Sequence, residues 1–459
     1  MTNSEEEQFP AMRFMPHTEA DLRAMLDTVG AASIDDLIAH VPAELRESAK
    51  MALAPGLGEQ AVAAEMAALA SRNRGADFIS FHGGGYYNHY VPAVVRAVTS
   101  RAEFATSYTP YQAEASQGTT QAIFEFQTLI TQLTGLAVAN ASMYDGASAA
   151  AEAVLMAHRI APKRTVVALS RALWPDYRAT IRTYLSALSG SQIVEVPFDN
   201  DSGRIDLAEL RKLADDNLLC VVAGYPNGFG IIEPLQEVAN IAHQAGASAI
   251  SATAEALALG LLKSPGELGI DIAVGEGQSF GMPLQYGGPG LGFMAAREAH
   301  LRRMPGRLVG QTRDAAGKRA FTLTLATREQ HIRRERATSN ICTNHSLCAL
   351  AATVYLAMMG RRGLRELAER NVELAHQAHD ALAAKNLAPR FSGPFFNEFM
   401  VKVPRAAAFL EAAEQRGILA GLPMTPDYPE LDDAVLIAVT EMNRADDLAR
   451  LAGALAKTL

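Results

Sequence analysis

The chain has 459 residues, of which 49% are hydrophobic and 20% charged, and its formal net charge is −9 at pH 7. This length and composition allow two or three domains with sizeable cores and argue against a disordered chain. The negative charge argues against a general nucleic-acid-binding protein. The longest apolar run, near residues 347–359, is shorter than the ~20 residues that a membrane-spanning helix needs.

The cysteines and the N-terminus predict a soluble cytoplasmic protein. Cys220, Cys342 and Cys348 form no CxxC or zinc-binding spacing, and an odd number of cysteines fits a reducing compartment. Residues 1–10 (MTNSEEEQFP) are acidic and resemble neither a secretion signal nor a transit peptide. We expect Cys342 to be a small buried side chain rather than a redox group.

Charge is unevenly distributed along the chain. Residues 1–50 carry a net charge of −6, whereas residues 302–336 carry +7. A basic run of this kind is either a solvated helix face or a surface that receives an acidic partner or a carboxylate.

The first 75 residues predict an N-terminal helical segment. Thr18 precedes an amphipathic stretch and has Asp21 three residues further on, and Ser33 with Asp36 repeats the arrangement. Both pairs have the spacing of a capping box, so each predicts the start of a helix.

Residues 76–330 predict a large α/β domain with a mostly parallel sheet of about seven strands. Short apolar runs alternate with longer helical segments there, which is typical of a parallel sheet covered on both faces. The predicted strands are 136–140, 165–169, 193–198, 218–224, 247–251, 270–274 and 291–295, and the predicted helices are 147–160, 175–188, 207–214 and 233–244. Residues 331–459 predict a small C-terminal α+β domain, with a long helix followed by strands near 398–403 and 434–439.

Residues 81–117 contain the most unusual composition of the chain. They include FHGGGYYNHYVP and TSYTPYQAEASQG, with three consecutive glycines, Tyr86, Tyr87, His89, Tyr108 and Tyr111. Glycines let a backbone approach a ligand closely, and tyrosines offer an apolar ring with a polar tip. The stretch has no evident nucleophile, so it predicts the wall of a small-molecule site rather than its reactive centre.

Several common motifs are absent. The glycine triplet lacks the GxGxxG spacing of a dinucleotide site, and Gly317-Lys318-Arg319 lacks the first glycine and the Ser or Thr of a phosphate loop. His82 and His89 have no carboxylate or cysteine cluster beside them in the sequence, so we expect no metal site. No Ser-His-Asp set can be argued from spacing.

Asp145, Gly146, Ala147 and Ser148 are the candidates for a phosphate cradle, because they open a predicted helix directly after a strand. An ordinary tight turn explains them equally well. An aminotransferase-like, pyridoxal-phosphate fold places a cradle at such a turn, and it also needs an Asp and a Schiff-base Lys at the ends of later strands. None of the eight lysines lies at such a turn. If the chain has this fold, it has lost that chemistry.

Long segments of the chain resemble one family. They include GYYNHYVP, YTPYQAEASQG, TGLAVANASMYDGASAAAEA, LQYGGPG, MPGRLVGQTRDAAGK and TREQHIRRERATSNICTN. The sequence resembles the glycine decarboxylase (P-protein) of the glycine cleavage system, and in particular the first subunit of its two-subunit form. The resemblance implies an aminotransferase-like fold and a pyridoxal-phosphate enzyme that decarboxylates glycine and passes the aminomethyl group to the lipoyl group of H-protein.

The chain departs from this family at the reactive positions. Ser251 stands where the lysine-bearing chain has its Asp, and Gln278-Ser279 stand near the His-Lys pair. The resemblance therefore implies no catalytic residue in this chain, a homologous second subunit that carries the cofactor, and a shared site across their interface. By analogy we expect two copies of each subunit in the complex.

The expected roles follow from the resemblance. We expect Tyr86, Tyr87, His89, Tyr108 and Tyr111 to reach the partner's site, or else to pack the interface. Two further residues, Arg307 and Arg313, are expected to bind a carboxylate or to dock H-protein, or else to form surface salt bridges. Asp145–Ser148 would be a vestigial cradle. Two other functions stay open, namely a non-catalytic scaffold or regulatory subunit, and an independent enzyme that has reused the fold.

Overall fold

The computed structural model describes residues 16–341, 343–425 and 427–455, and contacts divide the chain into two compact units, Met1–Arg74 and Gly75–Leu459. Cys342, which we expected to be buried, lies outside the described residues. The division of the second unit into a large domain over residues 76–330 and a small one over 331–459 stays a prediction.

The first unit is helical. Its helices are α1 (Glu19–Val29), α2 (Ile34–Leu37), α3 (Ala43–Ser48) and α4 (Glu59–Ala70). The two predicted capping boxes are confirmed, since Thr18 with Asp21 begins α1 and Ser33 with Asp36 begins α2. Between residues 16 and 74 no side chain is buried, so these short helices depend on their caps and local contacts rather than on a core.

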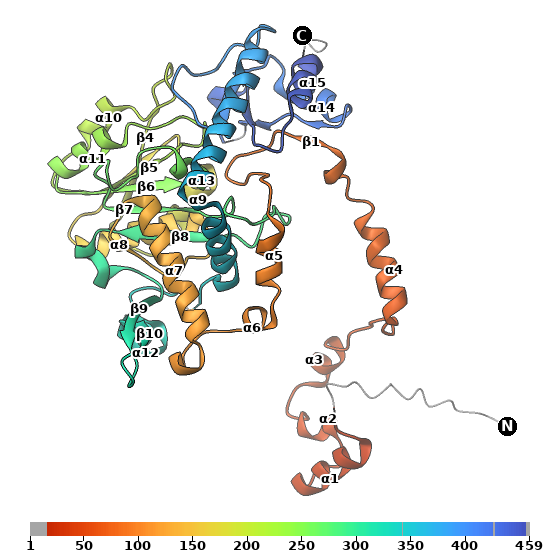
Figure 1. Cartoon of the computed structure of the whole chain (residues 1–459). Coiled ribbons are helices and arrows are strands. Elements are labelled where there is room, and N and C mark those ends of the chain that lie inside the picture. The colour runs from red at the N-terminus through yellow and green to blue at the C-terminus, as the bar shows by residue number, and fades with distance from the viewer. Residues whose placement is uncertain (1–15, 342, 426, 456–459) are drawn as a thin grey trace. The chain divides into compact units, whose positions relative to one another are not determined.

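The second unit is built around a seven-stranded sheet (Figure 1). The strand order is β2-β8-β7-β6-β5-β3-β4, and only β8 runs opposite to the other strands. This confirms the predicted mostly parallel sheet. The strands are β2 (Val138–Ala139), β3 (Val166–Ser170), β4 (Gln192–Val196), β5 (Leu218–Gly224), β6 (Ser248–Thr253), β7 (Ile272–Glu276) and β8 (Gly292–Ala296).

Helices cover both faces of this sheet. The helical elements from residue 75 to residue 303 are α5 (Ala93–Thr99), α6 (Ala102–Ala105), α7 (Gln117–Thr134), α8 (Gly146–Ile160), α9 (Pro175–Leu185), α10 (Leu207–Lys212), α11 (Leu235–Gln244) and the 3₁₀ turns at 75–77, 113–115, 256–260 and 298–303. Successive side chains of a strand point to opposite faces. Ala249 and Ala273 therefore join the core under α7 and α11, while Ile250 and Ile272 join the core under α8 and α9.

The C-terminal part forms a second, three-stranded sheet. Its antiparallel strands are ordered β11 (Glu398–Lys402), β14 (Ala434–Ala438) and β13 (Leu422–Pro423), and α14 (Ala406–Glu414) and α15 (Ala445–Leu455) accompany them. The long α13 (Ser346–Ala383) has a break at Gly360 and leads from the large sheet to this one (Figure 1). The short β1 (Ile79–Ser80) pairs in parallel with β12 (Ile418–Leu419), which ties the start of the unit to its C-terminal part.

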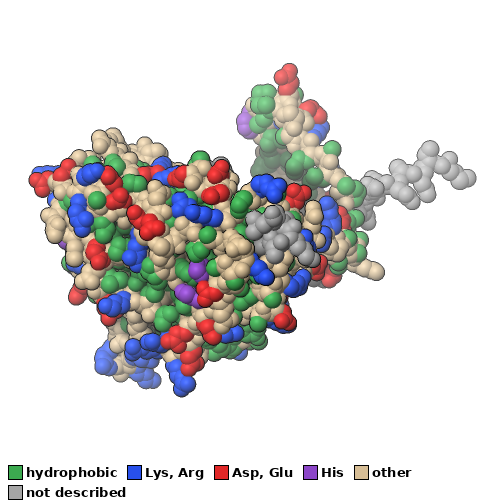
Figure 2. Space-filling model, turned by 90° about the horizontal axis from the view of Figure 1, so that it is seen from above, with side chains coloured by type: hydrophobic (Ala, Val, Ile, Leu, Met, Phe, Trp, Pro, Cys, Tyr) green, Lys and Arg blue, Asp and Glu red, His purple; other side chains and the backbone are tan. Residues whose placement is uncertain are grey.

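The basic run was interpreted incorrectly as a possible helix face. Much of it is an antiparallel hairpin of β9 (Leu308–Arg313) and β10 (Arg319–Thr324), followed by short helical turns at 326–328, 330–333 and 334–336. The long helix begins at Ser346, later than predicted. On the face seen in Figure 2, acidic and basic side chains are interspersed. None of the described helices is long and apolar enough to cross a bilayer.

Candidate functional site

The loop from Gly83 to His89 lies between the large sheet and the C-terminal sheet. Gly84 and Gly85 have φ angles of 75° and 115°, in the region that favours glycine. Gly83 needs to be glycine for another reason, because a Cβ there would overlap Glu398 Oε1 and come within 2.6 Å of Ala438 Cβ. The glycine run is therefore required for close packing of this loop against β11 and β14.

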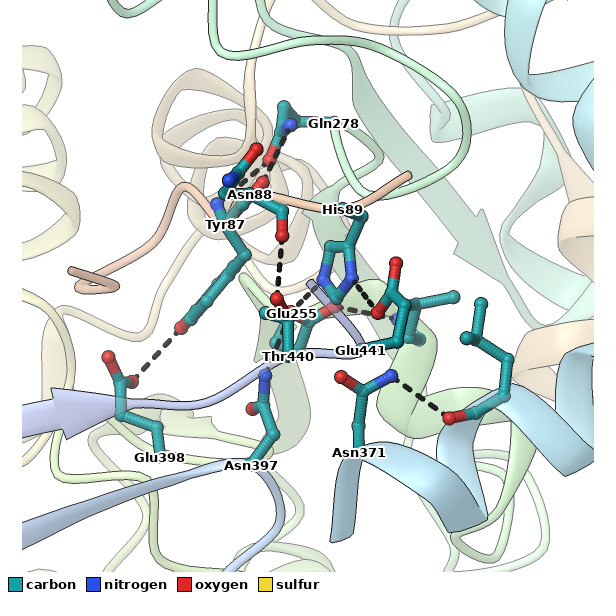
Figure 3. Close-up of polar contacts among 12 residues, drawn as sticks. Tyr87, Asn88, His89, Glu255, Gln278, Asn371, Asn397, Glu398, Thr440 and Glu441 are labelled. Atoms are coloured by element: carbon teal, nitrogen blue, oxygen red, sulfur yellow. Dashed lines mark hydrogen bonds and ion pairs between the residues drawn. The ribbon is translucent and has the colours of Figure 1, made fainter. Parts of the chain in front are cut away.

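His89 connects both halves of the unit through two carboxylates (Figure 3). Its Nε2 lies 3.0 Å from Glu255 Oε2, and its Nδ1 lies 2.8 Å from Glu441 Oε2. The side chains of His89 and Glu255 are each only 2% exposed. Burial by itself would lower the pKa of His89, but the two carboxylates outweigh it and raise this pKa to about 10. At neutral pH His89 is thus an imidazolium that donates one hydrogen bond to each carboxylate.

Tyr87 is also held within the chain (Figure 3). Its hydroxyl donates to Glu398 Oε2 at 3.0 Å, while the backbone N–H of Gly84 donates to Glu398 Oε1 at 2.7 Å. Gln278 accepts from the Tyr87 N–H at 3.0 Å and donates to the Tyr87 carbonyl at 3.1 Å. Gln278 stands near the position that the family resemblance pairs with a histidine. Its two hydrogen bonds hold the loop from Gly83 to His89, called the tyrosine loop below, against the end of β7.

Stability should depend on pH through Glu398. Burial raises the pKa of this carboxyl from 4.5 to about 8, so between these values the folded state holds a proton that the unfolded state has lost. Its contribution to stability is therefore full below pH 4.5 and declines as the pH rises toward 8. Glu398→Gln can keep both contacts without charge, and we expect its stability relative to the unsubstituted chain to improve by about 2–4 kcal/mol between pH 5 and pH 9.

Thermal midpoints of the two proteins at both pH values measure this change. Glu414→Gln is the matched control, since Glu414 is exposed on α14 and should give the same small difference at both pH values. A constant difference for Glu398→Gln as well would show that the Glu398 carboxyl does not titrate in this range.

The predicted phosphate cradle is a capped helix start. Asp145 and Ser148 form a capping box at the N-terminus of α8, with Asp145 Oδ1 accepting from the Ser148 N–H at 2.7 Å. The neighbouring Gly146 N–H donates to Glu276 Oε2 at 3.0 Å. Glu276, the last residue of β7, is 2% exposed and accepts two further backbone N–H groups. The Gly146 N–H, which in a phosphate cradle would donate to the phosphate, therefore donates to the Glu276 side chain instead.

Ser251 and Ser279 lie in the interior. Ser251 is in the middle of β6 and is fully buried, and Ser279, just after β7, is 1% exposed. Neither hydroxyl has a hydrogen-bond partner among the described residues. Both positions that the resemblance relates to the Asp and Lys of the lysine-bearing chain are thus taken by small buried side chains; that relation itself stays a prediction.

The other predicted residues range from exposed to buried. Tyr108 and Tyr111 are 75% and 54% exposed. Tyr86 is half-buried, and burial together with the nearby Glu276 raises the pKa of its hydroxyl. Arg307 is buried, with Nε 3.4 Å from Glu329 Oε2, and it donates to the Tyr111 hydroxyl at 3.2 Å. The interpretation of Arg307 as a surface salt bridge is therefore wrong.

Arg313 differs from Arg307 in being exposed. It lies at the end of β9 and donates to the Gly317 carbonyl at 2.8 Å, within the turn of its own hairpin. Its predicted contact with a carboxylate or with H-protein stays a prediction.

An apolar groove follows α5 and the first half of α13. One part, of about 720 Å³, is lined by Val91, Val95, Met282, Pro283, Leu347 and Ala351 among others. A second part, of about 340 Å³, shares Pro92 with the first and includes Tyr90, Tyr355 and Met442. Tyr90, Leu347 and Met442 are all exposed. Adjoining apolar hollows with exposed rims are typical of surfaces that bind another protein.

The sequence reasoning missed four carboxylates that shape this region. Glu276 and Glu255 follow predicted strands, and a carboxylate at the end of a buried parallel strand is a signal that could have identified them. Glu398 and Glu441 lie in or after strands of the C-terminal sheet, more than 300 residues from the loop they bind. Nothing local in the sequence marks these two as partners of the loop.

Comparisons with known proteins agree with this arrangement. A family model described as glycine cleavage system P-protein matches residues 12–455. The chain is 52% identical over 446 residues, covering 96% of it and 99% of the relative, to the probable glycine dehydrogenase (decarboxylating) subunit 1 of Anaeromyxobacter dehalogenans strain 2CP-C. It is 47% identical over 442 residues to the protein of that name from Geobacillus kaustophilus strain HTA426, covering 95% of this chain and 97% of the relative.

Solved structures give the same result. A crystal structure of glycine decarboxylase (P-protein) of the glycine cleavage system, in inhibitor-bound form, matches with a TM-score of 0.89 and 44% identity, over 98% of this chain and 100% of that one. A sphingosine-1-phosphate lyase from Burkholderia pseudomallei shares the fold, with a TM-score of 0.64, 18% identity and coverage of 89% and 92% of the two chains. The predicted aminotransferase-like fold is confirmed, and the chain belongs to the glycine cleavage system P-protein family.

Proposed function

We propose that this chain is one half of a two-chain glycine dehydrogenase (decarboxylating), and that a homologous, lysine-bearing subunit supplies the cofactor. Its family membership, and the near-complete match to proteins named subunit 1, support a two-chain enzyme. The observation that carries the division of labour is the buried Ser279, which stands near the position that the resemblance gives to the Schiff-base lysine.

The residues of this chain do not fit pyridoxal phosphate. No lysine follows β7, where the sequence continues as Gly277-Gln278-Ser279, and β6 presents Ser251 in place of a carboxylate. At the start of α8 the Gly146 N–H already donates to Glu276, so a phosphate would meet a carboxylate there. We therefore derive no chemical step through a cofactor on this chain.

The apolar groove along α5 and α13 is the surface we assign to the lysine-bearing subunit. Desolvating its exposed rim, including Tyr90 and Leu347, would favour association. The loop held by His89 and Gln278 joins this groove at Tyr90, whose N–H donates to Glu441 at 2.8 Å. A rigid loop at the edge of an interface can place side chains in a neighbour's site at little entropic cost.

This chain would contribute side chains that enclose the partner's site and position its ligands, rather than groups that react. Tyr108 and Tyr111 are exposed and can cover the partner's site, where their rings would exclude water and their hydroxyls would bond an anionic group. Tyr87 and His89 are buried with partners inside this chain, so we assign them to holding the loop. Arg313 would meet acidic H-protein at the exposed hairpin. The odd set of cysteines supports a cytoplasmic location.

The proposed function is tested by exchange of labelled bicarbonate into the carboxyl group of glycine, with lipoylated H-protein and pyridoxal phosphate present. The assay uses this chain alone, the lysine-bearing subunit alone, and both together. We expect exchange above background only in the mixture. Full exchange by the partner alone would reduce this chain to a scaffold or regulatory subunit, and exchange by this chain alone would contradict the role given to Ser279.

Tyr108 and Tyr111 supply a sharper prediction. Replacing either with alanine should lower the exchange rate of the assembled complex by about 10-fold or more, because one site-covering hydrogen bond or ring contact typically contributes 1–3 kcal/mol. Gel filtration should show the complex intact. Tyr184→Phe, on α9, keeps the ring that packs against the core; it is the control and should leave exchange unchanged. A loss of exchange that merely follows a loss of complex would instead assign these tyrosines to interface packing.

A further inference from the structure

Three backbone N–H groups from separate segments converge on the side chain of Glu276. The N–H groups of Leu291 and Gln278 donate to Oε1 at 2.7 and 3.0 Å, and that of Gly146 donates to Oε2 at 3.0 Å. Gly146 opens the fifteen-residue helix α8, whose dipole adds positive potential at this point. Converging N–H donors at a helix start are the usual means by which proteins bind phosphate and other oxyanions.

Two tyrosine hydroxyls border the same point. A Cβ on Gly290 would lie 2.8 Å from Tyr86 Oη and 2.9 Å from Glu276 Oε2, and a Cβ on Gly146 would overlap Tyr177 Oη. Tyr177 is 3% exposed, and its hydroxyl has no hydrogen-bond partner among the described residues. An unpartnered donor buried beside three converging N–H groups indicates a site whose donors exceed what its present occupant satisfies.

The occupant is nevertheless well matched in charge. A carboxylate accepts charge-assisted hydrogen bonds from backbone N–H groups, and these offset part of the cost of burying it. Burial still raises the pKa of Glu276 to about 7, so the three N–H groups offset only part of the cost of ionising this buried carboxyl, and it is mostly ionised only above that pH. The arrangement is a filled anion site rather than an empty one.

We propose that the N–H groups of Gly146, Gln278 and Leu291 form an oxyanion site whose resident anion is the side chain of Glu276, and that phosphate can enter only when this side chain is removed. Phosphate exclusion by Glu276 stands on the contacts above, whereas its meaning for cofactor binding rests on the proposed function. The site that would hold a cofactor phosphate is closed from within, so this chain leaves cofactor binding to its partner.

The test uses the full-length chain alone, with inorganic phosphate as the probe and sodium chloride of equal ionic strength as the reference. The unsubstituted chain should show no saturable phosphate-dependent rise in thermal midpoint. Glu276→Ala and the milder Glu276→Ser should be less stable in chloride and should gain a saturable rise, with a half-point on the order of millimolar. A bound signal in the phosphorus-31 NMR spectrum should appear with the same concentration dependence.

Glu233→Ala is the matched control. Glu233 is also a buried carboxylate that accepts a backbone N–H, that of Ile205 at 2.9 Å, but it accepts no second one from the residues that the structure describes. Its substitution should destabilise the chain without phosphate rescue. Saturable phosphate binding by the unsubstituted chain would overturn the proposal, and so would folded Glu276 variants that bind none.

A variant recovered in folded form only with phosphate present supports the proposal. No partner subunit and no turnover enter this measurement. Its failure is therefore distinguishable from failure of the bicarbonate exchange, which tests the proposed function.

Discussion

Replacing His89 with alanine is expected to destabilise the second unit by about 3–5 kcal/mol, because two carboxylates then lose the cation between them. Glu255 is 1% exposed and cannot recover water, and Glu441 is only partly exposed. The cation is present at neutral pH, since the carboxylates raise the pKa of His89 to about 10. The lost stability is measured as the shift in the urea unfolding midpoint of the isolated chain.

The dependence on pH adds a second readout for His89. The folded pKa lies above the ordinary 6.5, so the stabilisation is complete below pH 6.5 and disappears as the pH rises through about 10. The difference in unfolding free energy between His89→Ala and the unsubstituted chain should therefore decrease between pH 6.5 and about pH 10. Arg101→Ala is the control, because Arg101 and Glu103 form an exposed ion pair whose loss should have little effect on stability. Equal effects of the two substitutions would contradict a buried charged connection.

Gly230→Ala should also be severely destabilising, by about 3–5 kcal/mol. Gly230 has a φ of 80°, and a Cβ there would overlap the carbonyl oxygen of Glu398. That oxygen belongs to the backbone of β11, so β11 and the segment around Gly230 would have to move apart. The same movement would displace the Glu398 carboxylate from Gly84 and Tyr87. We therefore expect a lower unfolding midpoint together with weaker protection of the tyrosine loop in hydrogen exchange.

Gly190→Ala separates the two causes of that effect. Gly190 has a similar φ of 89°, but nothing lies within 4 Å of the position its Cβ would take. Gly190→Ala should therefore lower the unfolding free energy only by the cost of a left-handed backbone, about 1–2 kcal/mol. If Gly230→Ala cost no more than Gly190→Ala, the contact with β11 would be looser than the structure gives.

The large sheet could be predicted because its strands carry their own signal. The strand predicted at 218–224 coincides with β5, and the strand predicted at 291–295 differs by one residue from β8. These segments are buried on both faces, so they are short, continuous apolar runs between helices. The hairpin at 308–324 was not predicted, because its many basic residues were interpreted only as a charged surface or helix face. Its alternation of apolar and polar residues around Asp314–Lys318 was an available signal.

The site was harder to predict than the fold. That Ser279 and Ser251 stand near the positions of the Lys and Asp is implied by the family resemblance alone, and it stays a prediction. The role of Glu276 could not, since it depends on three N–H groups that come from residues 146, 278 and 291. The burial of His89 depends likewise on Glu255 and Glu441, which are 166 and 352 residues away in the chain. Contacts between residues so far apart in the chain can be predicted only once the order of the strands in the sheet is known.

The pairing of β1 with β12 has a consequence for synthesis on the ribosome. Residues 79–80 find their strand partner only at 418–419, and the loop that follows is bound by residues 398 and 441. A nascent chain emerges from its N-terminus, and contacts of long sequence separation form late. The loop at the edge of the apolar groove is therefore completed only when almost the whole chain has been made. Truncated or stalled chains would contain the residues of this loop but would lack Glu398 and Glu441, which hold it in place.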